Sequence, residues 1–326
     1  MFVSFQFVLL GFDLLVLFSS TVLYGQEESY EAKLRKHRED SLRVVAENEA
    51  KAREKAFIDK QNAVRIAYNE GLKQMRLRQD ERAIQSFRKA VNVDVEGVDD
   101  TKAKAYYVEA FCQKRLRRYY KAVEAYGNAI ELDPNYTEAY YGLGKTYADI
   151  GNDDQAIEVF QRAIAVDANY DKAHYELGRV YLDKKKDYNK AIESFKKTTE
   201  VNPQHDNAFT ALGTAYLKQG RTQDAISALE SAVAIDVKNY LASYHLASAY
   251  NQTGKSTKAL ESAKRALQAR SNFAPAAFEA GMALKALKRY DEAKQYFTEA
   301  AKDRQWRKNA QYEIDLINDE IKRGSD

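Results

Sequence analysis

The stretch AYYGLGKTYADIGNDDQAIEVFQRAIAVDA, residues 139–168, decides the fold of this chain. On both sides of Gly151-Asn152, apolar residues recur at spacings of three and four, which is the pattern of an amphipathic helix. Glycine and asparagine are residues that turn a chain. The stretch therefore predicts two helices joined by a tight turn, and not an α/β domain.

The alanine at position 156 returns along the chain at intervals of 39, 34, 35, 34, 34 and 34 residues. These alanines are Ala83, Ala122, Ala156, Ala191, Ala225, Ala259 and Ala293. A second small residue follows each of them seven positions later, and a glycine or alanine stands twelve positions before each, or thirteen before Ala191. Small residues remove the side chains that would hold two helix backbones apart where they cross. A period this regular predicts a stacked array of helical repeats.

The aromatic, Leu-Gly, Tyr, Ala, Phe and Ala positions of residues 139–168 stand in the order that is typical of the tetratricopeptide repeat (TPR) family, and the chain resembles that family. Seven units begin near Val64, Ala103, Thr137, Asp171, Asp206, Tyr240 and Ala274. The resemblance implies an all-α fold, a right-handed α-solenoid of seven helix–turn–helix units. The second unit departs from the pattern, because Glu109 and Gln113 stand where it has Leu and Tyr. Extra residues precede this unit within 96–102, and one more lies in the Lys184-Lys185-Lys186 turn of the fourth.

The two ends of the chain flank these units, which we place at residues 63–307. Residues 308–326 predict a C-terminal capping helix, with Ala310, Ile314, Ile317 and Ile321 on one face. Residues 26–62 alternate acids and bases without Gly or Pro, which predicts one long charged helix. We expect it to act as a solvated spacer. The alternative is a coiled-coil seam through Leu42, Val45, Ala52, Ala56, Ala63 and Ile66, which Glu49 and Asp59 interrupt.

The extreme N-terminus is almost wholly apolar from Phe2 to Tyr24 and has no Lys or Arg. We interpret residues 1–25 as a signal peptide, and the Gly25-Gln26 junction resembles cleavage sites of bacterial envelope proteins. Asp13 lies inside the apolar run and would cost roughly 2.5–3.5 kcal/mol at the centre of a membrane helix. An uncleaved membrane anchor is the alternative. Both interpretations place the repeats in an extracytoplasmic space, either the periplasm or the exterior of a bacterial cell.

Composition argues against several classes of protein. The formal net charge is only +3, so a dedicated nucleic-acid binder is not expected. Cys112 is the only cysteine, which excludes a disulfide framework. None of the four histidines stands at metal-ligand spacing from another, and we expect no metal, cofactor or catalytic site. His174 is expected in the core or at an interface between units. Asp99-Asp100 and Asp153-Asp154 are expected to cap helices instead of holding calcium.

The resemblance implies that the first helix of each unit lines a concave groove, which holds an extended peptide or a helix of a partner. The fifth position of each unit should face this groove. It is occupied by Tyr68, Tyr107, Tyr141, Tyr175, Thr210, Tyr244 and Phe278. Tyrosine offers a large contact area and a hydroxyl group at low entropic cost, which favours partner recognition. The alternative is that these rings simply pack against the next unit.

The ninth positions vary more, and the resemblance implies that they select the ligand. They are Leu72, Phe111, Lys145, Arg179, Thr214, Ser248 and Met282. Lys145 and Arg179 predict a basic centre for the groove, to which Arg65, Lys104, Lys114, Arg115 and Lys172 would add. A half-buried cation needs a charge partner, so we expect a partner with carboxylate and apolar groups. The alternative is that these are ordinary solvated charges.

These observations favour a non-catalytic protein-interaction scaffold of the cell envelope. The residues expected to bind the partner are Tyr68, Tyr107, Tyr141, Lys145, Tyr175, Arg179, Tyr244 and Phe278. The alternative function is a structural adaptor, which self-associates or is tethered to a membrane through the charged N-terminal helix.

Overall fold

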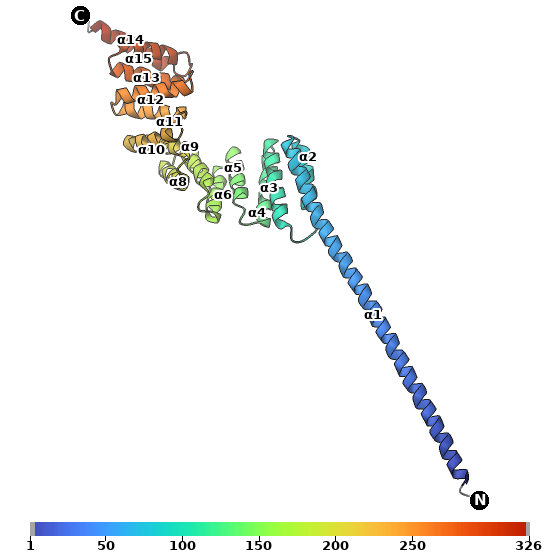
Figure 1. Ribbon diagram of the computed structural model, residues 1–326. Coiled ribbons are helices and arrows are strands. Elements are labelled where there is room, and N and C mark those ends of the chain that lie inside the picture. The colour runs from blue at the N-terminus through green and yellow to red at the C-terminus, as the bar shows by residue number, and fades with distance from the viewer. Residues whose placement is uncertain (1–3, 324–326) are drawn as a thin grey trace.

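The computed structural model describes residues 4–323, and it describes side chains from residue 27 onward. This part of the chain forms fifteen α-helices and one π-helical turn, without strands. Figure 1 shows the helices stacked in sequence order, with α1 projecting from one end of the stack as a long rod. The α-solenoid and its seven units, predicted from the period of the alanines, are confirmed.

Each unit contains a first and a second helix. The first helices are the C-terminal part of α1 (Ser4–Arg76), α3 (Asp99–Arg115), α5 (Thr137–Asp149), α7 (Asp171–Val180), α9 (Asp206–Lys218), α11 (Tyr240–Gln252) and α13 (Ala274–Ala286). The second helices are α2 (Asp80–Val91), α4 (Tyr119–Leu132), α6 (Asp153–Val166), α8 (Tyr188–Val201), α10 (Thr222–Ile235), α12 (Ser256–Ala269) and α14 (Tyr290–Ala300). The last helix, α15 (Arg307–Arg323), packs on α14.

Helix α1 joins the charged N-terminal segment to the first unit without a break. All side chains from residue 27 to residue 60 are exposed, and Val64 is the first that is buried. At 1.5 Å per residue this exposed part is about 50 Å long. The predicted signal peptide, residues 1–25, lies outside the residues whose side chains are described. Within residues 27–323, whose side chains are described, none of the helices combines the length and apolar character that crossing a membrane requires.

In five of the seven units a large side chain of the second helix lies against a glycine of the first helix. A Cβ atom added to Gly178 would lie 2.7 Å from the ring of Phe195, so any side chain there would collide with that ring. Gly281 has the same relationship to Phe297, at 2.7 Å. In the sixth unit Ala247 replaces the glycine, and Ala263 replaces the ring. The small positions predicted from the repeat are therefore the places where two helices approach most closely.

The turn within each unit contains one residue in the left-handed conformation. Glycine occupies this position in three turns, with φ of 82° at Gly151, 73° at Gly220 and 71° at Gly254. Lysine or arginine occupies it in the other four, namely Arg78, Arg117, Lys186 and Lys288. The additional residue of the fourth unit is absorbed in the π-helical turn Tyr181–Lys185, which Asp187 closes by donating its N–H to the carbonyl of Tyr181 at 3.0 Å.

The end of the array is covered as predicted. Ala310 and Ile317 of α15 are fully buried, while Lys285 of α13 donates to Glu313 of α15 at 2.7 Å. The expectation that two Asp pairs cap helices was wrong in detail. Asp99-Asp100 and Asp153-Asp154 are the first residues of α3 and α6, where their charge suits the positive helix terminus, but neither cap position makes a side-chain hydrogen bond.

Candidate protein-binding surface

The inner face of the array is formed by the first helices. Helix α3 contacts α1 and α5, α5 contacts α7, and α11 contacts both α9 and α13. Within the described residues, no two successive second helices are in comparable contact. Because the first helices lie closer together, the array curves with them on the inside. The positions that were predicted to face a groove therefore lie on the side that a partner segment could follow.

The aromatic residues at the fifth positions, which we call the ladder, are half-buried. Their rings pack against other rings. Four of the six rings lie between a ring of the same unit and a ring that precedes or begins the next helix pair. Tyr141, for example, lies 6.3 Å from Phe160 of α6 and 5.6 Å from Tyr170, measured between ring centroids. Tyr175 lies 5.8 Å from Phe195 and 4.8 Å from His205. The rings thus help to join consecutive units, while their remaining exposed edges face the inner side.

Of the other ladder residues, Tyr107 and Phe278 have both contacts, and Tyr244 and Tyr68 have one each. Tyr107 contacts Tyr126 and Tyr136, Tyr244 contacts Phe273, Phe278 contacts Phe297 and Trp306, and Tyr68 contacts Phe87. Burial raises the pKa of the Tyr107, Tyr175 and Tyr244 hydroxyls, so these groups stay neutral at physiological pH.

The fifth unit replaces this aromatic contact by hydrogen bonds. Asn239 donates to the hydroxyl of Thr210 at 3.0 Å and to the carboxylate of Asp206 at 2.8 Å. Its own side-chain oxygen accepts from the N–H of Ala242, at the start of α11. The side chain of Asn239 therefore makes all three of its hydrogen bonds within the protein. This part of the ladder offers little to a ligand.

The basic centre is neutralised in part by the chain itself. Lys145 of α5 lies 3.0 Å from one carboxylate oxygen of Glu176, and Arg179 of α7 lies 3.3 Å from the other. The Lys145 ammonium also lies 5.6 Å from the centre of the Tyr141 ring. One carboxylate is therefore shared by two cations, and the cluster keeps one positive charge. The expected need for an external carboxylate is smaller than the sequence suggested.

Three of the other predicted basic residues are also paired. Lys104 contacts Asp100 at 2.8 Å, Lys114 contacts Asp149 at 2.8 Å, and Arg115 forms a two-pronged pair with Asp80. Lys172 lies over the ring of Tyr170, 6.0 Å from its centre. The inner surface of the first four units therefore consists of ion pairs set among aromatic and apolar side chains, such as the half-exposed Phe111.

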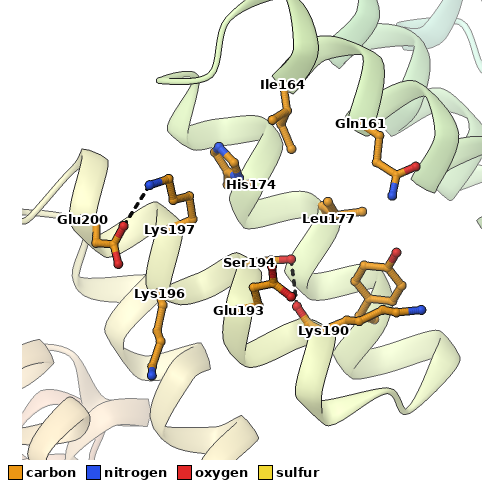
Figure 2. Close-up of a pocket in the computed structure, with 11 residues that line it drawn as sticks. Gln161, Ile164, His174, Leu177, Lys190, Glu193, Ser194, Lys196, Lys197 and Glu200 are labelled. Carbon is orange, nitrogen blue, oxygen red and sulfur yellow. Dashed lines mark hydrogen bonds and ion pairs between the residues drawn. The ribbon is translucent and has the colours of Figure 1, made fainter.

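A concavity on the outer side lies between the second helices α6 and α8, with α7 beneath it (Figure 2). It has a volume of about 680 Å³, an apolar floor that includes Ile164 and Leu177, and a rim of lysine and glutamate side chains. Similar grooves of about 320 Å³ lie between α2 and α4 and between α10 and α12. These grooves recur wherever second helices splay apart, so they are a consequence of the repeat and do not by themselves identify a ligand.

Two residues of types that often serve in catalysis, His174 and Cys112, are both buried. His174 is buried as expected, and its Nε2 lies 3.0 Å from the carbonyl oxygen of Ala168. Burial raises the pKa of the Cys112 thiol to about 12, so the nucleophilic thiolate is scarce at neutral pH. Within residues 27–323, no three His, Cys, Asp or Glu side chains gather as they would around a metal ion.

Comparison with protein-family models places these features in one family. Models described as "Tetratricopeptide repeat" match residues 175–238, 210–275 and 274–302, and one described as "TPR repeat" matches residues 117–151 and 144–185. The chain belongs to the TPR family. No curated protein sequence matches it. The family models indicate a protein-interaction scaffold and no enzymatic family.

Solved TPR structures share the architecture. A TPR protein from Parabacteroides merdae is 14% identical, covers 78% of this chain and 99% of its own, and has a TM-score of 0.54. The pilF protein of Pseudomonas aeruginosa is 16% identical, covers 69% of this chain and 100% of its own, and has a TM-score of 0.57. A MamA protein is 30% identical over 51% of this chain and 90% of its own, with a TM-score of 0.48. At 14% and 16% identity, the first two structures show only that the fold is shared.

The sequence analysis did not predict two features of the inner face. The rings that fill the space between ladder residues, Tyr136, Tyr170, His205, Phe273 and Trp306, follow the ladder by 28 to 30 residues, a second period that was present in the sequence. The pair of Asp80 and Arg115 joins residues 35 positions apart, at one repeat length. Comparing every position of the repeat with its equivalent in the next unit would have found both.

Proposed function

We propose that this TPR protein binds a peptide or helix of a partner protein along its inner face and has no catalytic activity of its own. The observation that carries the proposal is the row of half-buried rings on adjacent first helices, interrupted by the charged cluster of Lys145, Glu176 and Arg179. Rigid aromatic side chains give contact area at little entropic cost, and the charged cluster fixes the register of a bound segment.

The test uses a variant that removes the charges and keeps the shape. In the triple variant Lys145→Gln, Glu176→Gln and Arg179→Gln, the side chains can still form hydrogen bonds with one another. A matched control replaces an exposed ion pair of the second helix α6, Glu158→Gln and Arg162→Gln, whose charged atoms are 2.7 Å apart. Capture of a partner from native cells should be lost with the first variant and kept with the second, while both keep the wild-type melting temperature within a few degrees. Equal capture by the two variants would contradict the proposal.

We also propose that the repeats function outside the cytoplasm. The apolar N-terminal stretch before Gly25-Gln26 supports this location. Mass spectrometry of the protein from its native cells should give the mass of a chain that begins at Gln26. A chain that keeps residues 1–25 would favour a membrane anchor, and a chain recovered from the cytoplasm would refute both arrangements.

A second function, self-association through α1, is favoured by the exposed apolar residues on that helix. Leu42, Val45 and Ile66 of the predicted seam are 62%, 54% and 69% exposed. A second copy of the chain could cover them. Replacing Leu42 and Val45 by Lys should convert an oligomer to a monomer in analytical ultracentrifugation. A wild-type protein that is already monomeric at high concentration would exclude this function.

A further inference from the structure

The ends of the helices lie along two edges of the array. Because consecutive helices run in opposite directions, the turns within units lie at one edge, which we call the turn edge, and the connections between units lie at the other, the loop edge. The turns are residues 77–79, 116–118, 150–152, 181–187, 219–221, 253–255 and 287–289. The connections are residues 92–98, 133–136, 167–170, 202–205, 236–239, 270–273 and 301–306. Helix α1 leads into the first turn with its C-terminal end, so its rod projects from the loop edge (Figure 1).

The two edges differ in charge. The seven turns contain ten lysines and arginines and two aspartates, whereas the seven connections contain four basic and six acidic residues. When the four adjoining residues of each helix end are included, the turn edge has 21 basic against 10 acidic residues, a net charge of +11. The loop edge then has 10 basic against 14 acidic residues, a net charge of −4. Helix dipoles do not explain the difference, because each edge contains seven helix N-termini and seven C-termini.

The left-handed residues of four turns are basic and have no partner for their side chains within residues 27–323. These residues are Arg78, Arg117, Lys186 and Lys288. Each side chain is exposed, and in this part of the chain it forms neither an ion pair nor a hydrogen bond. The neighbouring Arg118 and Arg289, by contrast, are paired with acids of the helix that follows. Glycine would adopt the left-handed conformation more easily, so these four turns keep a free positive charge where glycine would be more stable.

We propose that the turn edge binds an acidic segment of a polypeptide, which crosses several turns and places carboxylates against the free lysines and arginines. Carboxylates form short, charge-assisted hydrogen bonds with both of these side chains. The sequence predicted a partner with carboxylates from Lys145 and Arg179, but both of those residues contact Glu176. The free cations lie at the turn edge instead. This surface is distinct from the inner face, so the proposal does not depend on the proposed function.

Other anionic partners fit the turn edge less well. The array is curved, so a flat bilayer would touch only a few turns, whereas a flexible chain can follow the curve. None of the exposed residues in the seven turns is aromatic, and proteins that bind single-stranded nucleic acid stack its bases on aromatic rings. An acidic polypeptide needs only the lysines and arginines that the turns supply.

The probe is a fluorescently labelled peptide of about twenty glutamates, and its binding to the full chain is followed by fluorescence anisotropy. In the test variant the four free residues become glycine, as Arg78→Gly, Arg117→Gly, Lys186→Gly and Lys288→Gly. Glycine removes the charge and suits the positive φ, so the variant should melt no lower than the wild type while its dissociation constant rises by about tenfold or more. The matched control removes four charges from exposed residues of α1 that form no ion pair within residues 27–323, as Lys33→Gln, Lys36→Gln, Lys51→Gln and Lys55→Gln. The control should change the dissociation constant by less than about twofold.

Equal binding by the glycine variant and the wild type would overturn the proposal. An equal loss in the control would also overturn it, because the attraction would then follow the net charge of the chain alone. Phosphatidylglycerol vesicles and single-stranded DNA test the other partners, and tighter binding of the wild type to either than to the peptide would refute the assignment of a polypeptide. The inner-face variant Lys145→Gln, Glu176→Gln and Arg179→Gln should bind the peptide as the wild type does. Loss of binding in that variant would place the peptide on the inner face and contradict the proposal.

Discussion

A Cβ atom on Gly144 would lie 2.7 Å from Cε1 of the Phe160 ring, a distance that packed side chains do not tolerate. Phe160 is fully buried, so it has no free space into which to move. We expect Gly144→Ala to lower the free energy of unfolding by about 1–3 kcal/mol, which is the usual effect of overpacking a core. Urea denaturation followed by circular dichroism measures this change.

Gly127 provides the control for that substitution. It also lies within a helix, α4, but no atom would come within 4 Å of an added Cβ. Gly127→Ala should therefore stabilise the protein by up to about 1 kcal/mol, because alanine loses less backbone entropy in a helix. If the two variants change stability equally, steric contact with the ring is not what selects glycine at position 144.

The turns offer a second test of local structure. Lys288 has a φ of 59°, a conformation that costs a residue with a side chain about 1 kcal/mol. Lys288→Gly should therefore raise the free energy of unfolding by about that amount, and Gly151→Ala, at the equivalent turn of the third unit, should lower it. A Lys288→Gly variant less stable than the wild type would show that the lysine side chain makes a compensating interaction.

The stability of the sixth unit should depend on pH through His245. Burial, assisted by the nearby charge of Lys218, lowers the pKa of this imidazole to about 4, against 6.5 in the unfolded chain. Because the unfolded state takes up the proton first, the contribution of His245 is complete above pH 6.5 and is lost as the pH falls toward 4. The loss is at most about 3 kcal/mol, since each pKa unit corresponds to about 1.4 kcal/mol.

Comparison of variants isolates this effect. The difference in melting temperature between the wild type and His245→Gln should shift in favour of the variant between pH 6.5 and pH 4. His37 is exposed on α1, so His37→Gln should follow the wild type at every pH. Parallel curves for the wild type and His245→Gln would mean that this histidine is solvated in the folded protein.

The fold could be predicted from the sequence because its main determinants repeat. Gly144, Ala156 and Ala163 are small for steric reasons that apply in every unit, so the period exposes them without any knowledge of contacts. The π-helical turn at Tyr181–Lys185 was visible only as an additional residue. Its conformation depends on how α8 packs against α7, which a local pattern does not specify.

The candidate surface could be predicted only in part. The period identified Lys145 and Arg179, but whether a charge is available to a partner depends on neighbours in another unit. Glu176 forms an ion pair with both of them, although it is 31 residues from Lys145. Periodicity therefore finds candidate positions, and pairing between units decides which of them remain free.

In the proposed function, the first helices and not the second form the binding surface. Photo-crosslinking tests it most directly, because the reactive group can be placed on one face at a time. Phe111 of the first helix α3 and Tyr120 of the second helix α4 are both exposed aromatic residues, at 43% and 80%. A photoreactive phenylalanine analogue at position 111 should crosslink a distinct partner protein in native cells, and the same analogue at position 120 should not. Crosslinking of a partner from position 120 alone would contradict the account.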